Sequence, residues 1–192
     1  GHEVHVIHSL DAYDLKKNGK KDDINDNAEH IYRLKTDLGP VSAAGAYLTG
    51  RNRNADRLVD KVCSEVKPDW IHYHNISMLG CGVLSKVKSK KIYTCHDHWP
   101  FCKRNDFMKF GENICDVQNC VKCSIQSHRP VRMISTNQIV SEIKRLDAVI
   151  SPSNYMKNML DVLGLESVLI KNFVPRPTED ISTKDDFHFV YA

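Results

Sequence analysis

The stretch from Pro68 to Trp99 constrains the fold of this chain most, because it reads as strand, helix, strand. The segments DWIHYHN and KKIYTCHDHW each carry a short β-type apolar run that ends in polar residues. Between them, an apolar stripe with helical spacing runs from Met78 to Val87. Such a unit predicts a parallel sheet, and in open parallel sheets ligands bind outside the carboxyl ends of the strands.

Polar residues gather at both predicted strand ends. The first strand closes with His72, His74 and Asn75, and the second closes with His96, Asp97 and His98. Because the carboxyl ends of parallel strands meet at one edge of a sheet, we expect these side chains to lie together. The sequence therefore predicts a functional site at this edge.

Composition indicates an ordinary globular protein. The chain has 192 residues, of which 41% are hydrophobic and 27% charged, and its length suggests one large domain or one and a fraction. No apolar run approaches the roughly 20 residues of a membrane span, and no signal peptide opens the chain. Seven cysteines, an odd number, suit a reducing compartment, so we expect a cytoplasmic location.

The net charge of +3 is mild. The lysine clusters LKKNGKK and KVKSKK read as a solvated face, with peripheral contact to an acidic membrane surface as the alternative. No nucleic-acid motif accompanies them, and we expect no nucleic-acid partner.

The remaining segments alternate in the same way. EVHVIHS and HIYRLKT predict strands, residues 11–28 a surface loop, and residues 40–66 a long helical region, with Ser42 as its N-cap and RNRNADR as a break. Residues 131–148 predict another helix. The strand DAVISPS, a helix capped by Ser153, and the strands SVLIKNFVP and FHFVYA follow. Alternating strands and helices predict an α/β fold with a doubly wound parallel sheet.

Five of these segments also resemble a known family. In order and spacing, GHEVHVI, PDWIHYHN, IYTCHDHW with the Cys-rich loop after it, DAVISPSNYMKNML and VLIKNFVP are similar to the acceptor-side domain of retaining glycosyltransferases of family 4. The resemblance implies one Rossmann-like half of a GT-B fold over residues 1–175, without its first strand and helix, and with a Cys-rich insertion at 100–130. Residues 176–192 would form a linker and the first strand of a truncated C-terminal donor domain.

The resemblance also implies an activity. The full-length enzyme would transfer a sugar from a nucleotide-sugar donor to a glycan or lipid-linked acceptor, with retention, in polysaccharide or glycoconjugate biosynthesis. It would act in the cytoplasm or at the inner membrane face. The residues that hold the donor have no counterpart in this chain, so we expect the fragment alone to be inactive.

Individual site residues follow from matching the family motifs. His96 of T-x-H-D is implied to lie beside the reacting sugar, and Asp97 either orients His96 or caps the following turn. His74 and Asn75 of H-x-H-N, together with Trp99, are implied to contact the acceptor. The chemistry suits a cleft in which polar groups position reactants and stabilise developing charge.

Four cysteines follow Trp99 with the spacing C-x12-C-x4-C-x2-C; they are Cys102, Cys115, Cys120 and Cys123. The terminal C-x2-C presents two thiolates to one tetrahedral ion, which predicts a structural zinc site. An iron–sulfur cluster and free thiols remain the alternatives. The other three cysteines lie on apolar faces and are predicted to pack as small hydrophobes; they are Cys63, Cys81 and Cys95.

Two further function classes stay open at this point. The pairs His72-x-His74 and His96-x-His98 could form the metal centre of a metallohydrolase, although no carboxylate has clear ligand spacing to both pairs. A non-catalytic, zinc-stapled module that binds carbohydrate or a protein is the third possibility.

Overall fold

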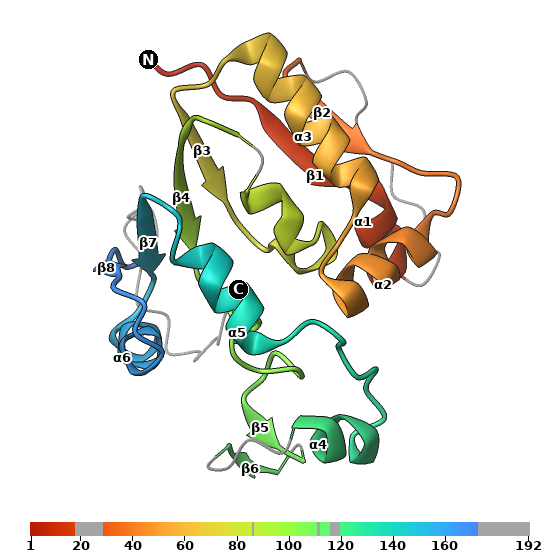
Figure 1. The fold of residues 1–192 in the computed structure, drawn as a ribbon, viewed down its shortest axis with the longest axis vertical. Coiled ribbons are helices and arrows are strands. Elements are labelled where there is room, and N and C mark those ends of the chain that lie inside the picture. Colours follow the sequence, from red (N-terminus) through yellow and green to blue (C-terminus); the bar gives the residue numbers. More distant parts are fainter. Residues whose placement is uncertain (18–28, 86, 111, 116–119, 173–192) are drawn as a thin grey trace, which may run out of the picture.

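Parallel strands alternate with helices along most of the chain, as the sequence predicts (Figure 1). The computed structural model describes residues 1–17, 29–85, 87–110, 112–115 and 120–172. The main elements are β1 (Val6–Ser9), α1 (Leu10–Lys17), β2 (Ile31–Leu34), α2 (Pro40–Thr49), α3 (Arg53–Val66), β3 (Trp70–Tyr73), β4 (Lys90–Thr94), α5 (Thr136–Ile143), β7 (Ala148–Ser151), α6 (Asn154–Val162) and β8 (Val168–Leu169).

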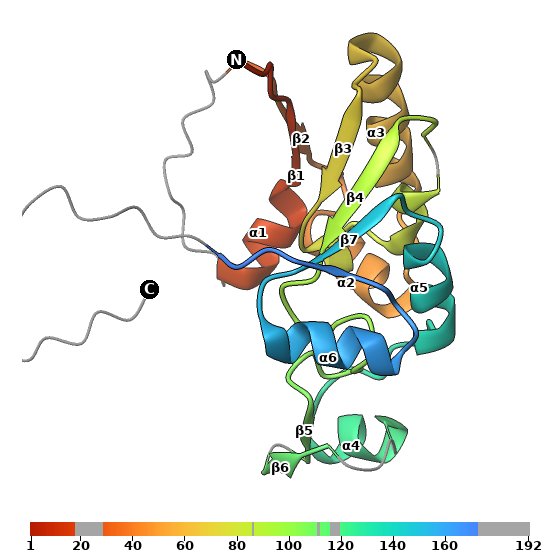
Figure 2. The same cartoon turned by 90° about the vertical axis from the view of Figure 1, so that its left-hand side faces the viewer.

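The strands form two parallel sheets within the described residues. One sheet has the order β3-β4-β7-β8, and the other contains β1 and β2. Helices α3 and α5 lie on one side of the strands and α1 lies on the other (Figure 2). This arrangement confirms the predicted α/β class with a parallel, Rossmann-like architecture.

A hollow of about 120 Å³ lies where β1 and β3 face each other. Its walls are mostly apolar and include Ile7, Val59, Ile71 and Val83. Neither of the two strands has a hydrogen-bonded strand on its facing edge in the described part of the chain.

The core lies between the sheets and the α3–α5 side. Helix α3 buries Ala55, Val59, Val62 and Cys63, which recur at helical spacing, and Asn52 caps it by accepting hydrogen bonds from the amides of residues 54 and 55. Cys63, Cys81 and Cys95 are all buried, which confirms the prediction that they pack in the core.

The predicted helix between β3 and β4 is wrong. Two short 3-10 helices, Ile76–Met78 and Cys81–Leu84, replace it. Gly80 between them has φ +86°, and a Cβ there would lie 2.8 Å from the carbonyl oxygen of Gly50. The chain must therefore turn sharply beneath α2, so the apolar stripe is buried without a continuous helix.

Two predictions in the first third of the chain also need correction. Residues 11–17 belong to helix α1 rather than to a surface loop; residues 18–28 lie outside the described residues. Ser42 lies inside α2, whose N-cap is Gly39 and whose first position is Pro40. The expected break is confirmed, since α2 ends before Gly50 and α3 starts at Arg53.

Helix α6 begins at its predicted cap, Ser153, whereas α5 begins at Thr136, five residues after the start of the predicted helical stretch. Ser135 and Gln138 form a capping box, so α5 spans only part of the predicted helical stretch. The Ser153 hydroxyl accepts from the Met156 amide at 3.2 Å, and Gly164 after α6 has φ +65°. The expected linker and last strand at 176–192 lie outside the described residues.

The Cys-rich segment projects from one end of the molecule (Figures 1 and 2). It contains a two-stranded antiparallel pair, β5 (Met108–Lys109) and β6 (Asn113–Ile114), and a short helix, α4 (Cys120–Gln126). Few of its side chains are buried, and they include Cys102 and Ser124. The segment therefore carries little hydrophobic core of its own.

Candidate functional site at the carboxyl ends of β3 and β4

The parallel register of β3 and β4 brings the predicted histidines together. Tyr73 lies opposite Tyr93 in the register, so the residues that follow each strand emerge at the same edge. There His74 Nδ1 and His96 Nε2 share a hydrogen bond of 2.8 Å, and their rings stack with centroids 5.1 Å apart. The two histidines thus lie at the same edge, as expected, and their rings are in direct contact.

His72 extends this row of rings. Its ring centroid lies 4.0 Å from that of His74, and its Nε2 hydrogen-bonds to the Thr94 hydroxyl at 2.7 Å. Burial, followed by the neighbouring His96, lowers the pKa of His72 below its ordinary value of 6.5. Burial, followed by His72 and His96, likewise lowers the pKa of His74. Both imidazoles are therefore neutral at neutral pH.

The hydrogen bond between His74 and His96 limits how many protons this pair can hold. One ring nitrogen must donate and the other must accept, which requires a lone pair on at least one ring. Protonating both imidazoles would remove that lone pair and place two positive charges in contact. The pair can thus donate or accept a hydrogen bond toward a ligand while it carries at most one positive charge.

Asp97 organises the turn that follows His96. Its Oδ1 accepts a hydrogen bond from the Trp99 amide at 2.9 Å, which is the geometry of an Asx turn. This contact supports the second of its two predicted roles, that of a turn cap. The buried Cys95 thiol just before this turn has its pKa raised to about 12 by burial, so it stays protonated and inert.

Trp99 lies beneath the site rather than on its surface. Its side chain is 2% exposed, and it packs near the guanidinium of Arg132 with 5.7 Å between the guanidinium carbon and the ring centroid. The structure therefore gives Trp99 a packing role under the turn, whereas an acceptor contact had been expected.

Arg132 is a residue that the sequence patterns missed. Only 1% of it is exposed, and it donates to the carbonyl oxygens of Trp99 at 3.0 Å and Cys102 at 2.8 Å. It therefore ties the turn after β4 to the start of the Cys-rich segment. The stretch VRMIS gave no signal for this role, because a single arginine before a helix cap is ordinarily a surface residue.

His98 faces a different set of partners. Its Nε2 hydrogen-bonds to the Tyr155 hydroxyl at 3.1 Å, and its ring stacks on Phe107 with centroids 5.5 Å apart. It thereby connects α6 and the Cys-rich segment to the site.

Asn75 supplies the last predicted polar group. It is exposed and has a left-handed backbone with φ +46°, a conformation that asparagine tolerates better than most residues. This backbone turns the chain away from β3 into the first 3-10 helix, so the Asn75 side chain stays at the exposed edge beside His74.

The histidines do not gather into a metal centre. Among the described residues, the single group of three or more potential ligands within 4.8 Å of one another is Glu3, His5 and His30. His74 contacts His96, whereas His98 turns toward Tyr155, so the two H-x-H pairs do not converge. The geometry therefore does not favour the metallohydrolase alternative.

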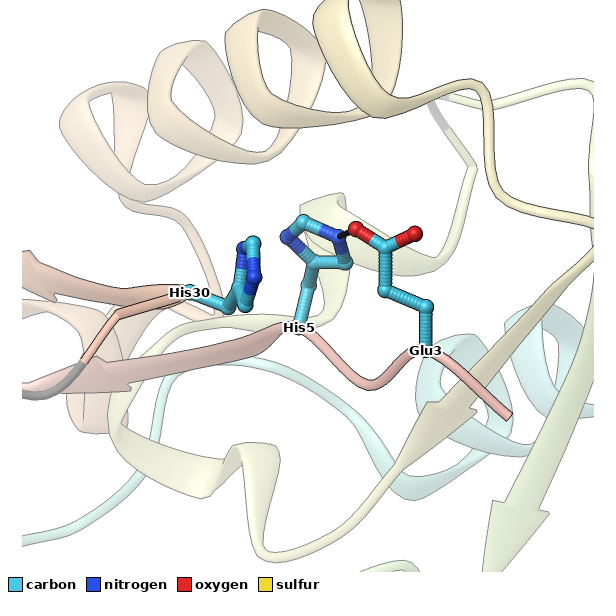
Figure 3. Close-up of side chains that lie close together, drawn as sticks. All are labelled: Glu3, His5 and His30. Atoms are coloured by element: carbon cyan, nitrogen blue, oxygen red, sulfur yellow. Dashed lines mark hydrogen bonds and ion pairs between the residues drawn. The ribbon is translucent and has the colours of Figure 1, made fainter. Parts of the chain in front are cut away.

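The Glu3, His5 and His30 cluster lies at the other ends of the strands (Figure 3). His5 directly precedes β1 and His30 directly precedes β2. His5 Nε2 hydrogen-bonds to a Glu3 oxygen at 2.9 Å, and its Nδ1 lies 3.3 Å from the Tyr32 hydroxyl. The Glu3 side chain is 72% exposed, so the cluster opens to the surface, and His5 also lines the hollow that His72 and His74 line.

The four cysteines predicted to bind metal line one hollow in the projecting segment. None of the seven cysteines forms a disulfide. The prediction that these four cysteines bind a structural metal stays a prediction.

The family model for Glycosyltransferase Family 4 matches residues 1–176. Comparisons with curated proteins and with solved structures gave no match. A search of the described helices for one with the length and hydropathy of a membrane span found none.

Proposed function

Since the chain belongs to Glycosyltransferase Family 4, we propose that it supplies the acceptor-side, Rossmann-like half of a GT-B enzyme that transfers a sugar from a nucleotide-sugar donor to a glycan or lipid-linked acceptor. The observation that carries this proposal is the hydrogen-bonded pair of His74 and His96 at the carboxyl ends of two adjacent parallel strands. In sheets of this kind, this is the edge at which ligands bind.

The proposed step is a substitution at the anomeric carbon with retention. The acceptor hydroxyl oxygen forms a bond to that carbon on the face from which the nucleoside diphosphate departs, and the carbon–oxygen bond to the diphosphate breaks. The hydroxyl proton passes to the departing diphosphate oxygen. Such a reaction depends on polar groups that position the two reactants and stabilise charge as it develops.

His96 is the residue that we assign to the reacting centre. It is exposed at the edge, and its Nε2 is hydrogen-bonded to His74. The other ring nitrogen, Nδ1, is therefore the atom that we assign to a substrate oxygen. A hydrogen bond from this imidazole would act on a sugar hydroxyl without any covalent bond to the enzyme.

His74 and Asn75 are assigned to acceptor binding. Both are exposed and follow β3, and the neutral state of His74 allows it to hydrogen-bond to hydroxyl groups. Asp97 acts through the turn that it caps and is therefore a positioning residue.

The nucleotide sugar enters this scheme as a substrate, and no residue of the chain is assigned to it. We place the enzyme in the cytoplasm, in polysaccharide or glycoconjugate biosynthesis, with the membrane surface as a peripheral contact when the acceptor is lipid-linked. The exposed lysines Lys88 and Lys90 after the 3-10 helices are candidates for such contact.

The test is release of nucleoside diphosphate from a panel of nucleotide sugars by the full-length gene product, with and without glycan acceptors. We expect His96→Ala to lower transfer by about 10²-fold or more, since removal of one group that stabilises developing charge typically costs this much. His128→Asn is the matched control: His128 is exposed, lies in the Cys-rich segment and has φ +51°, a backbone that asparagine accepts.

Three results would contradict the proposal. One is the absence of turnover with every donor while the protein is folded. Another is equal activity of the His96→Ala and unmodified enzymes. The third is carbohydrate binding without transfer, which would favour the non-catalytic binding module.

A further inference from the structure

Four thiols from three separate parts of the projecting segment line one hollow. Its volume is about 30 Å³, and its lining includes Cys102, Cys115, Cys120 and Cys123. We propose that this hollow is a structural zinc site with these four cysteines as its ligands. The proposal goes beyond sugar transfer, because the site lies apart from the His74–His96 edge and needs no substrate.

The backbone arranges the thiols as a zinc site requires. Cys102 follows the turn after β4, Cys115 follows β6, and Cys120 and Cys123 lie three residues apart in α4, where side chains share one helix face. The Cys115 amide donates to the Phe107 carbonyl oxygen at 2.9 Å, which fixes the strand pair against the start of the segment. Tetrahedral zinc with four thiolates is the common structural form of such a set.

Neighbouring groups suit bound thiolates. The Phe110 amide donates to Cys123 Sγ at 3.3 Å, the kind of supporting hydrogen bond that orients metal ligands. Three of the other residues that line the hollow are basic: Lys103, Arg104 and Lys109. Zinc with four thiolates carries a net charge of −2, and nearby cations would offset part of that charge. Arg104 is already paired with Asp106 at 2.7 Å, and the Lys103 ammonium donates to the Arg132 carbonyl oxygen at 2.9 Å.

The cysteine sulfurs lie farther apart than they would in an occupied zinc site. No three of these sulfurs lie within 4.8 Å of one another in the described structure, whereas sulfurs bound to one zinc at about 2.3 Å are closer together than this. Binding would therefore contract the segment, and each thiol would release its proton to solvent. The segment has little core of its own, so the metal would supply the order that packing does not.

Arg132 connects the Cys-rich segment to the histidine edge through hydrogen bonds. It is bonded to the carbonyl oxygens of both Trp99 and Cys102, and the Trp99 amide is bonded to Asp97. A metal that fixes Cys102 would thus also restrain the turn after His96.

The experiment measures metal in the purified full-length protein from cells grown with added zinc. We expect about one zinc per chain, released by a mercurial thiol reagent, and a cobalt-substituted form with an intense thiolate-to-cobalt charge-transfer band. Cys120→Ser and Cys123→Ser should each lower bound zinc at least tenfold. Cys63→Ala, which removes a buried thiol of α3, and His5→Ala should leave it unchanged.

Limited proteolysis of the unmodified protein tests the proposal without relying on variants that could fold poorly. In the unmodified protein, zinc removal should accelerate cleavage between residues 102 and 123 and leave the β3–β4 region intact. Less than one tenth of an equivalent of zinc in folded, unmodified protein would overturn the proposal. So would iron with sulfide in place of zinc, cobalt without a thiolate band, or zinc lost in His5→Ala and retained in both cysteine variants. None of these readouts depends on sugar transfer.

Discussion

The histidine edge and the Cys-rich segment differ in how they position the side chains predicted to be functional. At the edge, His74 and His96 follow two hydrogen-bonded strands whose register fixes where each chain emerges, and their rings are in contact. In the projecting segment, four thiols line one hollow and approach less closely. The difference teaches that strand pairing brings side chains into contact, whereas a segment with little core leaves its side chains farther apart.

The largest expected effect tests whether the two regions are coupled. Arg132→Met should lower the free energy of unfolding by about 3 kcal/mol, because two buried carbonyl oxygens lose a charged donor. Chemical denaturation measures this change. A loss under about 0.5 kcal/mol would show that the edge does not depend on this link. Arg129→Met is the control, because Arg129 is exposed nearby.

The next effect tests the support beneath the edge. Gly80→Ala should destabilise the protein by about 2 kcal/mol, because its φ of +86° strains an alanine and its Cβ would lie 2.8 Å from the Gly50 oxygen. Thermal and denaturant unfolding check the value. Gly45→Ala, where a Cβ meets nothing within 4 Å, should be neutral or slightly stabilising. Similar losses in both variants would contradict the close-contact explanation.

A third, smaller effect separates the two roles of Asp97. Asp97→Ala should cost about 1 kcal/mol of stability through loss of the turn hydrogen bond, while Asp97→Asn should retain most of it because an amide oxygen can still accept. Transfer rates of the full-length enzyme should follow the same order. If Asp97→Asn impairs transfer as strongly as Asp97→Ala, the carboxylate charge acts on His96 and the turn role is secondary.

The smallest effect is the pH dependence of the edge. The folded pKa values of His72 and His74 lie below the ordinary value of 6.5, so the unfolded chain binds protons that the folded chain does not. Stability is full above pH 6.5 and falls as the pH drops below it. His8, whose pKa is lowered by burial and then by Arg33, contributes in the same direction.

Denaturation at a series of pH values measures this slope. The His72→Gln and His74→Gln variants should show a shallower decline below pH 6.5 than the unmodified protein. An unchanged slope in both histidine variants would mean that these rings do not carry the linkage.

The sequence predicted the positions of most strands and the meeting of histidines at one edge, because period-2 apolar runs and parallel topology are local and general signals. The prediction failed between β3 and β4, where Gly80 and its contact with Gly50 override the helical spacing of the apolar residues. That contact joins residues 30 positions apart, so no local pattern reveals it. Residues 11–17 were missed as a helix because their polar composition resembles a loop.

Within the candidate site, the sequence pointed to His74, His96 and the four cysteines, whose types and spacings are chemically distinctive. It did not anticipate the hydrogen bond between the two histidines or the buried position of Trp99. Arg132 was missed altogether, because whether an arginine lies in the interior depends on carbonyl groups supplied by distant turns. The roles assigned to these residues in sugar transfer and zinc binding stay predictions.

The facing edges of β1 and β3 have a consequence for handling the protein. Each presents a row of amide and carbonyl groups without a strand partner in the described structure, beside a mostly apolar hollow. Open edges of this kind are templates on which another extended chain can add a strand. A preparation of these 192 residues should therefore self-associate with rising concentration, and a lysine or proline at an outward position of β3 should suppress that association.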